Sequence, residues 1–142
     1  MKNTSVKVRK KIKVSADAVW DTISAIGGVD KWLSMIQTCR FEGSGAGATR
    51  VCTTADGLTL NERIEKVDHT NRVFEYSIPE APLPVQDLFG TMKVHETADS
   101  SISEIEWSAT FGVEEVHEAE IVGMLKTIYT EGIDGLERLH QQ

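Results

Sequence analysis

The sequence predicts an α+β domain in which a seven-stranded antiparallel sheet curves around one long C-terminal helix. Three observations lead to this prediction. Turn signals divide residues 37–111 into six short strand-like segments, helical patterns occur only outside that region, and an amphipathic stripe runs through residues 122–139. Strands that follow one another through hairpins, with helices grouped at the ends of the chain, are typical of α+β proteins and not of α/β proteins.

Length and composition predict one ordinary domain. A chain of 142 residues buries roughly 70% of its unfolded surface on folding, so it needs no metal or disulfide for stability. The 15 basic and 22 acidic residues give a net charge of −7, which argues against a nucleic-acid partner. The chain has no apolar run of membrane-spanning length, no secretory signal and only two cysteines, Cys39 and Cys52. We therefore expect a cytoplasmic protein with reduced thiols and no cofactor, as a monomer or weak homodimer.

The first strand carries an unusual concentration of basic residues. Its apolar residues alternate with cations, which predicts a half-buried edge strand with a solvated basic face: Val6, Val8, Ile12 and Val14 on one side, Lys7, Arg9, Lys11 and Lys13 on the other. A run of this kind would also suit an arm for nucleic acid or an anionic membrane. Lys10 falls among the apolar residues, so it either reaches the rim of the sheet or places a cation inside.

Two short helices are expected after this strand. Ser15 is a suitable N-cap for the first, and Gly27-Gly28 is expected to stop it after an apolar stripe of Val19, Trp20, Ile23 and Ile26. The second is predicted over Val29–Met35, which contains Trp32 and Leu33.

The strand region begins with a predicted hairpin. Gln37–Glu42 and Thr49–Thr54 flank the glycine-rich loop 43–47, and centring that loop places Cys39 opposite Cys52 and Phe41 opposite Arg50. Four further strands are expected over Leu58–Val67, Val73–Ile78, Leu88–Glu96 and Ile102–Phe111.

Three glycines interrupt the apolar stripe of the last helix. Glycine costs about 1 kcal/mol relative to alanine inside a helix, so Gly123, Gly132 and Gly135 need a reason. They either leave space beside a ligand or allow close packing of the helix on the sheet.

Several stretches in this order resemble the START/Bet v 1-like (SRPBCC) superfamily, and within it the polyketide cyclase/dehydrase and lipid transport family. They are Val14–Trp20 followed by Trp32, Gly47–Arg50, Asn61–Ile64 leading to Asp68, Arg72–Ile78, Leu83–Val85 leading to Gly90-Thr91, Trp107–Phe111 and Tyr129–Leu139. The resemblance implies a helix-grip fold with a cavity between sheet and helix, which holds lipids, sterols, hormones or polyketides. Some members are cyclases. Plant abscisic-acid receptors share the pattern, including a glutamate at the position of Glu62 that faces the cavity and holds the ligand's polar end through water. Relatives often have a tyrosine where this chain has Leu88.

Alternation along the strands gives an independent list of inward residues. Glu62 shares a face with Leu60 and Ile64, so it should point inward, where a carboxylate needs a partner such as Arg50 or Lys10. That pair either fixes the barrel or anchors a ligand carboxylate or carbonyl. The predicted ligand-binding residues are Glu62, Arg50, Leu60, Tyr76, Phe74, Leu88, Met92, Trp107, Met124 and Ile128.

Other chemistry has weak support in the sequence. The histidines, at positions 69, 95, 117 and 140, lack metal-ligand spacing, and no Gly-Lys-Ser/Thr follows the glycine-rich loop, so neither a metal site nor a phosphate loop is predicted. The leading expectation is a protein that binds a small hydrophobic or amphipathic molecule. The alternatives are a polyketide cyclase or dehydratase that uses Glu62 as general acid or base, and an interaction module whose basic first strand and acidic last helix dock other proteins.

Overall fold

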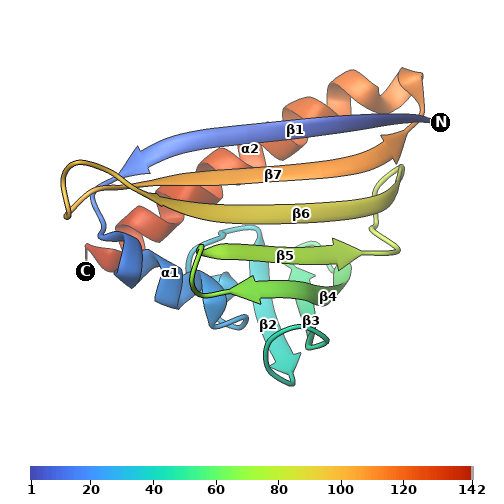
Figure 1. The fold of residues 1–142 in the computed structure, drawn as a ribbon. Helices are drawn as coiled ribbons and strands as arrows, with labels where there is room; N and C mark the ends of the chain where they lie inside the picture. Colours follow the sequence, from blue (N-terminus) through green and yellow to red (C-terminus); the bar gives the residue numbers. More distant parts are fainter. Residues whose placement is uncertain (142) are drawn as a thin grey trace.

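The computed structural model describes residues 1–141 and confirms the α+β architecture (Figure 1). In chain order the elements are β1 (Lys2–Ile12), α1 (Ala16–Ser24), the 3-10 turn η1 (Val29–Lys31), β2 (Ile36–Glu42), β3 (Thr49–Thr54), β4 (Thr59–Asp68), β5 (Val73–Ile78), β6 (Val85–Glu96), β7 (Ser103–Val113) and α2 (Glu115–His140). No helix in this part of the chain is both long enough and apolar enough to cross a membrane.

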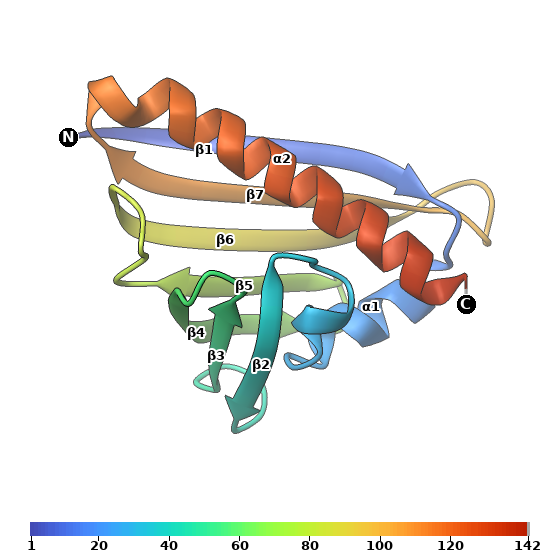
Figure 2. The same ribbon diagram turned by 180° about the vertical axis from the view of Figure 1, so that it is seen from behind.

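The seven strands form one antiparallel sheet in the order β1-β7-β6-β5-β4-β3-β2. Only β1 is paired away from its sequence neighbours, so β1 and β2 are the two edges. Helix α2 runs diagonally across one face of β1, β7 and β6, and its C-terminal end lies beside α1 (Figure 2). This is the predicted helix-grip arrangement, with the core between the sheet and α2.

The strand register agrees with the sequence patterns. Cys39 faces Cys52 and Phe41 faces Arg50 across the β2–β3 hairpin, as predicted. The largest difference in a strand boundary is at β6, which begins at Val85 and not at Leu88. The register of β6 shifts between Gln86 and Phe89, and Asp87 has a left-handed φ of 53°. Alternation is therefore broken over the first residues of β6, and becomes regular only at Leu88.

Helix α1 begins as predicted but ends differently. The Ser15 side chain caps it by accepting a hydrogen bond of 3.2 Å from the backbone N–H of Ala18. Its last turn is followed by Ile26 at φ 70°, so a β-branched residue and not Gly27 adopts the left-handed conformation. Gly27 serves close packing instead, because a Cβ there would lie 2.6 Å from the Phe41 ring.

The prediction of a second helix over Val29–Met35 was wrong. Only a 3-10 turn over Val29–Lys31 forms, entered through Gly28 at φ 79° and ended by Trp32 at φ −129°. This break lets both Trp32 and Leu33 reach α2, where they lie 3.4 and 3.2 Å from the position of a Cβ at Gly132. Packing against α2 therefore outweighs the weak local preference for helix.

The glycines of α2 divide into two kinds. A Cβ at Gly135 would lie 1.7 Å from the carbonyl oxygen of Trp32, and a Cβ at Gly132 would lie 2.6 Å from the Trp107 ring. Both positions therefore serve close packing. A Cβ at Gly123 would have no heavy atom within 4 Å, so nothing in the packing requires glycine there.

Most of the cations of β1 form ion pairs within the chain. Arg9 pairs with Glu104 and Lys7 with Glu106, both on the neighbouring strand β7. Lys10 reaches the rim, where it forms an ion pair with Asp134 of α2, so it is not the partner of Glu62. The basic face of this edge strand thus contributes to holding the sheet and α2 together.

Candidate functional site

A buried ion pair joins the neighbouring strands β3 and β4. Arg50 and Glu62 are directly opposite each other in the register and are exposed by only 6% and 8%. The Nε–H and an Nη2–H of Arg50 donate to Oε1 of Glu62, at 3.1 and 2.5 Å. Burial by itself lowers the pKa of Arg50, but the Glu62 carboxylate outweighs it, and the pKa is raised overall. Arg50 is thus the inward partner that Glu62 requires.

The third hydrogen bond of Arg50 reaches a strained turn. Its Nη1–H donates to the backbone carbonyl of Ile26 at 2.8 Å. Ile26 has a φ of 70°, which is unfavourable for a β-branched side chain and costs on the order of 1–3 kcal/mol. The turn between α1 and η1 is therefore held in a high-energy conformation with its carbonyl on the buried cation.

Aromatic side chains surround the pair and continue towards α2. The guanidinium carbon of Arg50 lies 5.4 Å from the centre of the Phe74 ring and 5.6 Å from that of Tyr76. The indole N–H of Trp107 donates to the Tyr76 hydroxyl at 2.9 Å. Trp107 also stacks on Tyr129 of α2, with ring centres 4.2 Å apart. A continuous polar and aromatic path thus connects the sheet to α2.

The two tyrosines of this path keep their protons at neutral pH. Burial, aided by the Glu62 carboxylate, raises the pKa of Tyr76 to about 12. Burial and the hydrogen bond to Tyr76 raise the pKa of Tyr129 well above its usual value. Both hydroxyls are therefore neutral groups that can donate a hydrogen bond, and neither is a base near pH 7.

The ten predicted ligand-binding residues fall into two groups. Seven are buried on the inner side of the sheet: Glu62, Arg50, Tyr76, Phe74, Leu88, Met92 and Trp107. Three are half-buried, namely Leu60 on β4 and Met124 and Ile128 on α2. The buried aromatic residues are packed against one another, and Tyr76 lies so close to Gly90 that a Cβ there would be 2.2 Å from its ring.

Three further groups complete the site and were absent from the sequence-based list. Tyr129 lies within the predicted stripe of residues 122–139, and its i, i+4 relation to Leu125 and Ile133 places it on the buried line of α2. Trp32 is buried and in edge-to-face contact with Trp107, with ring centres 5.8 Å apart, and its indole N–H has no hydrogen-bond partner within residues 1–141. No sequence pattern indicated a role for the Ile26 carbonyl, because the left-handed backbone conformation of an isoleucine cannot be predicted from sequence.

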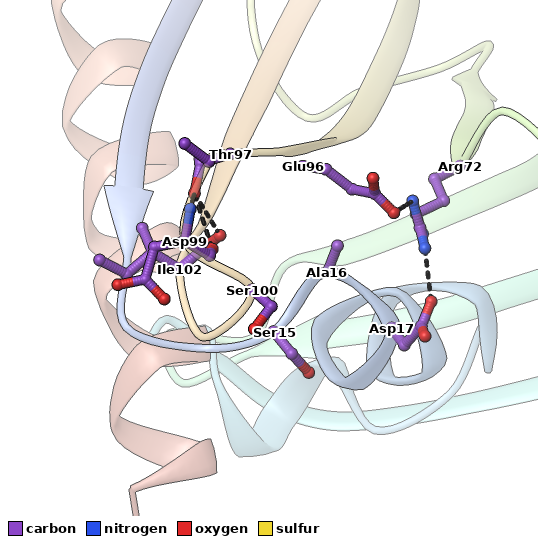
Figure 3. A pocket seen from close by; sticks show the side chains of 10 residues that line it. Ser15, Ala16, Asp17, Arg72, Glu96, Thr97, Asp99, Ser100 and Ile102 are labelled. Carbon is purple, nitrogen blue, oxygen red and sulfur yellow. Dashed lines mark hydrogen bonds and ion pairs between the residues drawn. The ribbon is translucent and has the colours of Figure 1, made fainter.

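Hollows open on the outside of the molecule. One of about 230 Å³ lies at the start of α1, where Arg72 bridges Asp17 at 2.5 Å and Glu96 at 3.1 Å (Figure 3). Two more, each of about 380 Å³, lie along the β2–β3 hairpin beside Arg40 and Val51. The cation of this groove, Arg72, is already paired with Asp17 and Glu96, so we take the buried Arg50–Glu62 pair as the stronger candidate for a binding site.

Comparison with known proteins identifies a family. The profile of the polyketide cyclase / dehydrase and lipid transport family matches residues 3–141. No curated protein matches the chain.

Solved structures share the fold over nearly the whole chain. The protein XoxI from Bacillus cereus is 31% identical, with a TM-score of 0.84, over 97% of this chain and 94% of its own. A protein from Bacillus thuringiensis is 29% identical, with a TM-score of 0.88, over 98% of this chain and all of its own. A protein from Thermobifida fusca, at 19% identity and a TM-score of 0.84 over 96% and 93% of the two chains, shows the fold alone.

Proposed function

We propose that this protein, which belongs to the polyketide cyclase/dehydrase and lipid transport family, binds a small amphipathic molecule between its sheet and α2. The ligand's polar end contacts Arg50 and its apolar part packs among the aromatic residues around Trp107. The observation that carries the proposal is the third hydrogen bond of Arg50, which ends on the carbonyl of a strained residue, Ile26. A ligand oxygen that replaces this carbonyl allows the turn to relax.

The charge balance of the site favours a neutral ligand oxygen. Arg50 and Glu62 together carry no net charge, so a ligand carboxylate would add a second buried anion beside a single cation. A ketone or ester carbonyl accepts the same hydrogen bond without that cost. The indole N–H of Trp32, which has no hydrogen-bond partner among the described residues 1–141, supplies a further donor to the interior. We therefore assign the ligand to the neutral carbonyl compounds with an apolar chain.

Binding requires the interior to open, because its aromatic side chains are in contact and Arg50 is already occupied. The Ile26–Gly28 turn is the part of the chain that we expect to move, since it holds stored backbone strain and contacts Arg50 directly. We place this activity in the cytoplasm, which fits the two free thiols.

Titration with three ten-carbon probes tests the proposal. We expect 2-decanone to quench the indole fluorescence and to bind about tenfold more tightly than decane, because a hydrogen bond to a charged group contributes about 1.5–3 kcal/mol. It should also bind more tightly than decanoate, whose carboxylate would be a second buried anion. Equal affinity for 2-decanone and decane, or no binding of any probe, would contradict it.

Variants separate the anchor from general destabilisation. R50M alone leaves Glu62 buried without a partner, so the double variant R50M/E62L, which removes both charges, is the more informative protein. It should lose the preference for 2-decanone over decane. R63M removes a cation from an exposed position of β4, the strand that carries Glu62, and this control variant should bind the probes as the parent does.

A further inference from the structure

We propose that Cys39 and Cys52 form a redox-active dithiol, which a hydroperoxide converts into an intramolecular disulfide. The two residues face each other across the antiparallel β2–β3 pair. The S–H of Cys52 donates to the sulfur of Cys39, with the two sulfur atoms 2.8 Å apart. Directly opposed residues in such a pair have Cα atoms about 4.5–5.5 Å apart, which lies within the range of about 4.4–6.8 Å that a disulfide requires. The bond can therefore form without movement of the strands.

The surroundings give the two thiols different roles. Cys39 is half-buried on the edge strand β2, whereas Cys52 is fully buried on β3. The hydrogen bond from Cys52, with further help from the Arg50 cation and the backbone N–H of Val29, lowers the pKa of Cys39 to about 7, against the opposing effects of burial and of Glu62. The same hydrogen bond and burial raise the pKa of Cys52. Cys39 is thus the accessible thiolate that reacts first, and Cys52 is the thiol that resolves the product.

The chemistry requires a hydroperoxide and no other oxidant. The Cys39 thiolate attacks the O–O bond of the hydroperoxide, so that an S–O bond forms, the O–O bond breaks, and the leaving alkoxide takes up a proton to become an alcohol. The sulfur of Cys52, on losing its proton, then attacks the sulfenic acid at Cys39. An S–S bond forms, and the leaving hydroxide takes that proton to become water. Two thiols are oxidised to one disulfide, and one peroxide is reduced by the same two electrons.

Oxidation of the reduced protein with hydrogen peroxide tests the proposal. We expect the thiol count to fall from two to zero, the intact mass to fall by that of two hydrogen atoms, and dithiothreitol to reverse both changes. The protein should remain a single chain on a non-reducing gel. The rate should be about tenfold lower at pH 6 than at pH 8, because the thiolate fraction of Cys39 changes around pH 7.

Single variants distinguish the two roles. C52S should stop at a sulfenic acid on Cys39 that dimedone captures, whereas C39S should retain its thiol. If C52S fails to fold, C52A takes its place and should form the same sulfenic acid at a higher pH, because it lacks the donor that lowers the pKa of Cys39. Persistence of both thiols in the parent protein would overturn the proposal. So would oxidation to sulfinic acid without a disulfide, disulfides formed only between chains, or equal reactivity of the two single variants. None of these results depends on whether the interior binds a ligand.

Discussion

The packing of α2 against the turn at Trp32 makes a quantitative prediction for alanine at Gly135. A Cβ there would lie 1.7 Å from the Trp32 carbonyl oxygen and 2.8 Å from its carbonyl carbon. Ordinary contact needs at least about 3.4 Å, so helix and turn must separate by roughly 1.7 Å, which forfeits much of the dispersion energy around Trp32 and Leu33. Overpacking of this kind costs about 1–3 kcal/mol or somewhat more, and the gain in helix propensity offsets only about 1 kcal/mol. Because the clash is with backbone, the upper end of that range applies, and we expect G135A to lower the free energy of unfolding by about 2 kcal/mol.

Urea unfolding followed by tryptophan fluorescence measures this effect, and the same helix supplies matched controls. G123A adds the same methyl group where nothing lies within 4 Å, so it should raise the free energy of unfolding by about 0.5–1 kcal/mol. G132A meets the Trp107 ring at 2.6 Å, a side chain that can shift, so its effect should fall between the other two. A G135A protein as stable as the parent would refute the close packing, and would revive the alternative that these glycines leave space for a ligand.

Three further predictions concern ionisable and capping groups. E106Q should lower the free energy of unfolding at pH 7 by about 1–2 kcal/mol and should reduce the loss of stability on acidification. Lys7, His95, Lys93 and Arg9 outweigh burial to lower the pKa of Glu106. The contribution of this carboxylate is therefore present above about pH 4.5 and is lost as the pH falls through the folded pKa. In alkaline titration, the absorbance of tyrosinate should appear only with unfolding above pH 10, because Tyr76 and Tyr129 are the two tyrosines and burial raises the pKa of both. S15A should cost about 1 kcal/mol by circular dichroism melting, because it removes the N-cap of α1.

Each of these has a clear contrary result. An E106Q protein as stable as the parent at pH 7 would show that the ion pairs of Glu106 with β1 contribute nothing. Reversible ionisation of either tyrosine near pH 10 in the folded protein would show that it is solvated. An S15A protein that melts at the same temperature as the parent would show that the Ser15 side chain does not stabilise α1.

Local patterns predicted most of the fold because they report directly on burial. Centring the glycine-rich loop placed the β2–β3 hairpin in the correct register, with Cys39 opposite Cys52 and Phe41 opposite Arg50. The errors occur where distant contacts override local preference. The segment after Gly28 forms one turn and not a helix because Trp32 and Leu33 pack on α2, more than 90 residues away in sequence.

The candidate site was predictable only in its polar centre. Because Glu62 was predicted to point inward from an apolar face, it needed a cationic partner. In the structure this partner is Arg50, whereas Lys10 forms an ion pair with Asp134. The contact between Arg50 and the Ile26 carbonyl could not be predicted, because it depends on a strained backbone conformation that sequence does not report. The contact of Trp107 with Tyr129 depends on how α2 crosses the sheet, which is a property of the whole fold.

One measurement tests the central claim, which is that a ligand binds between the sheet and α2 with its polar end at Arg50. In a ¹H–¹⁵N spectrum titrated with 2-decanone, the Nε–H signal of Arg50 and the indole signals of Trp32 and Trp107 should shift together with one saturation curve. The indole of Trp20, which donates to His69 outside this site, should not move with them. Shifts confined to exposed residues such as Arg63, with Arg50 and both interior indoles unchanged at saturation, would contradict the account.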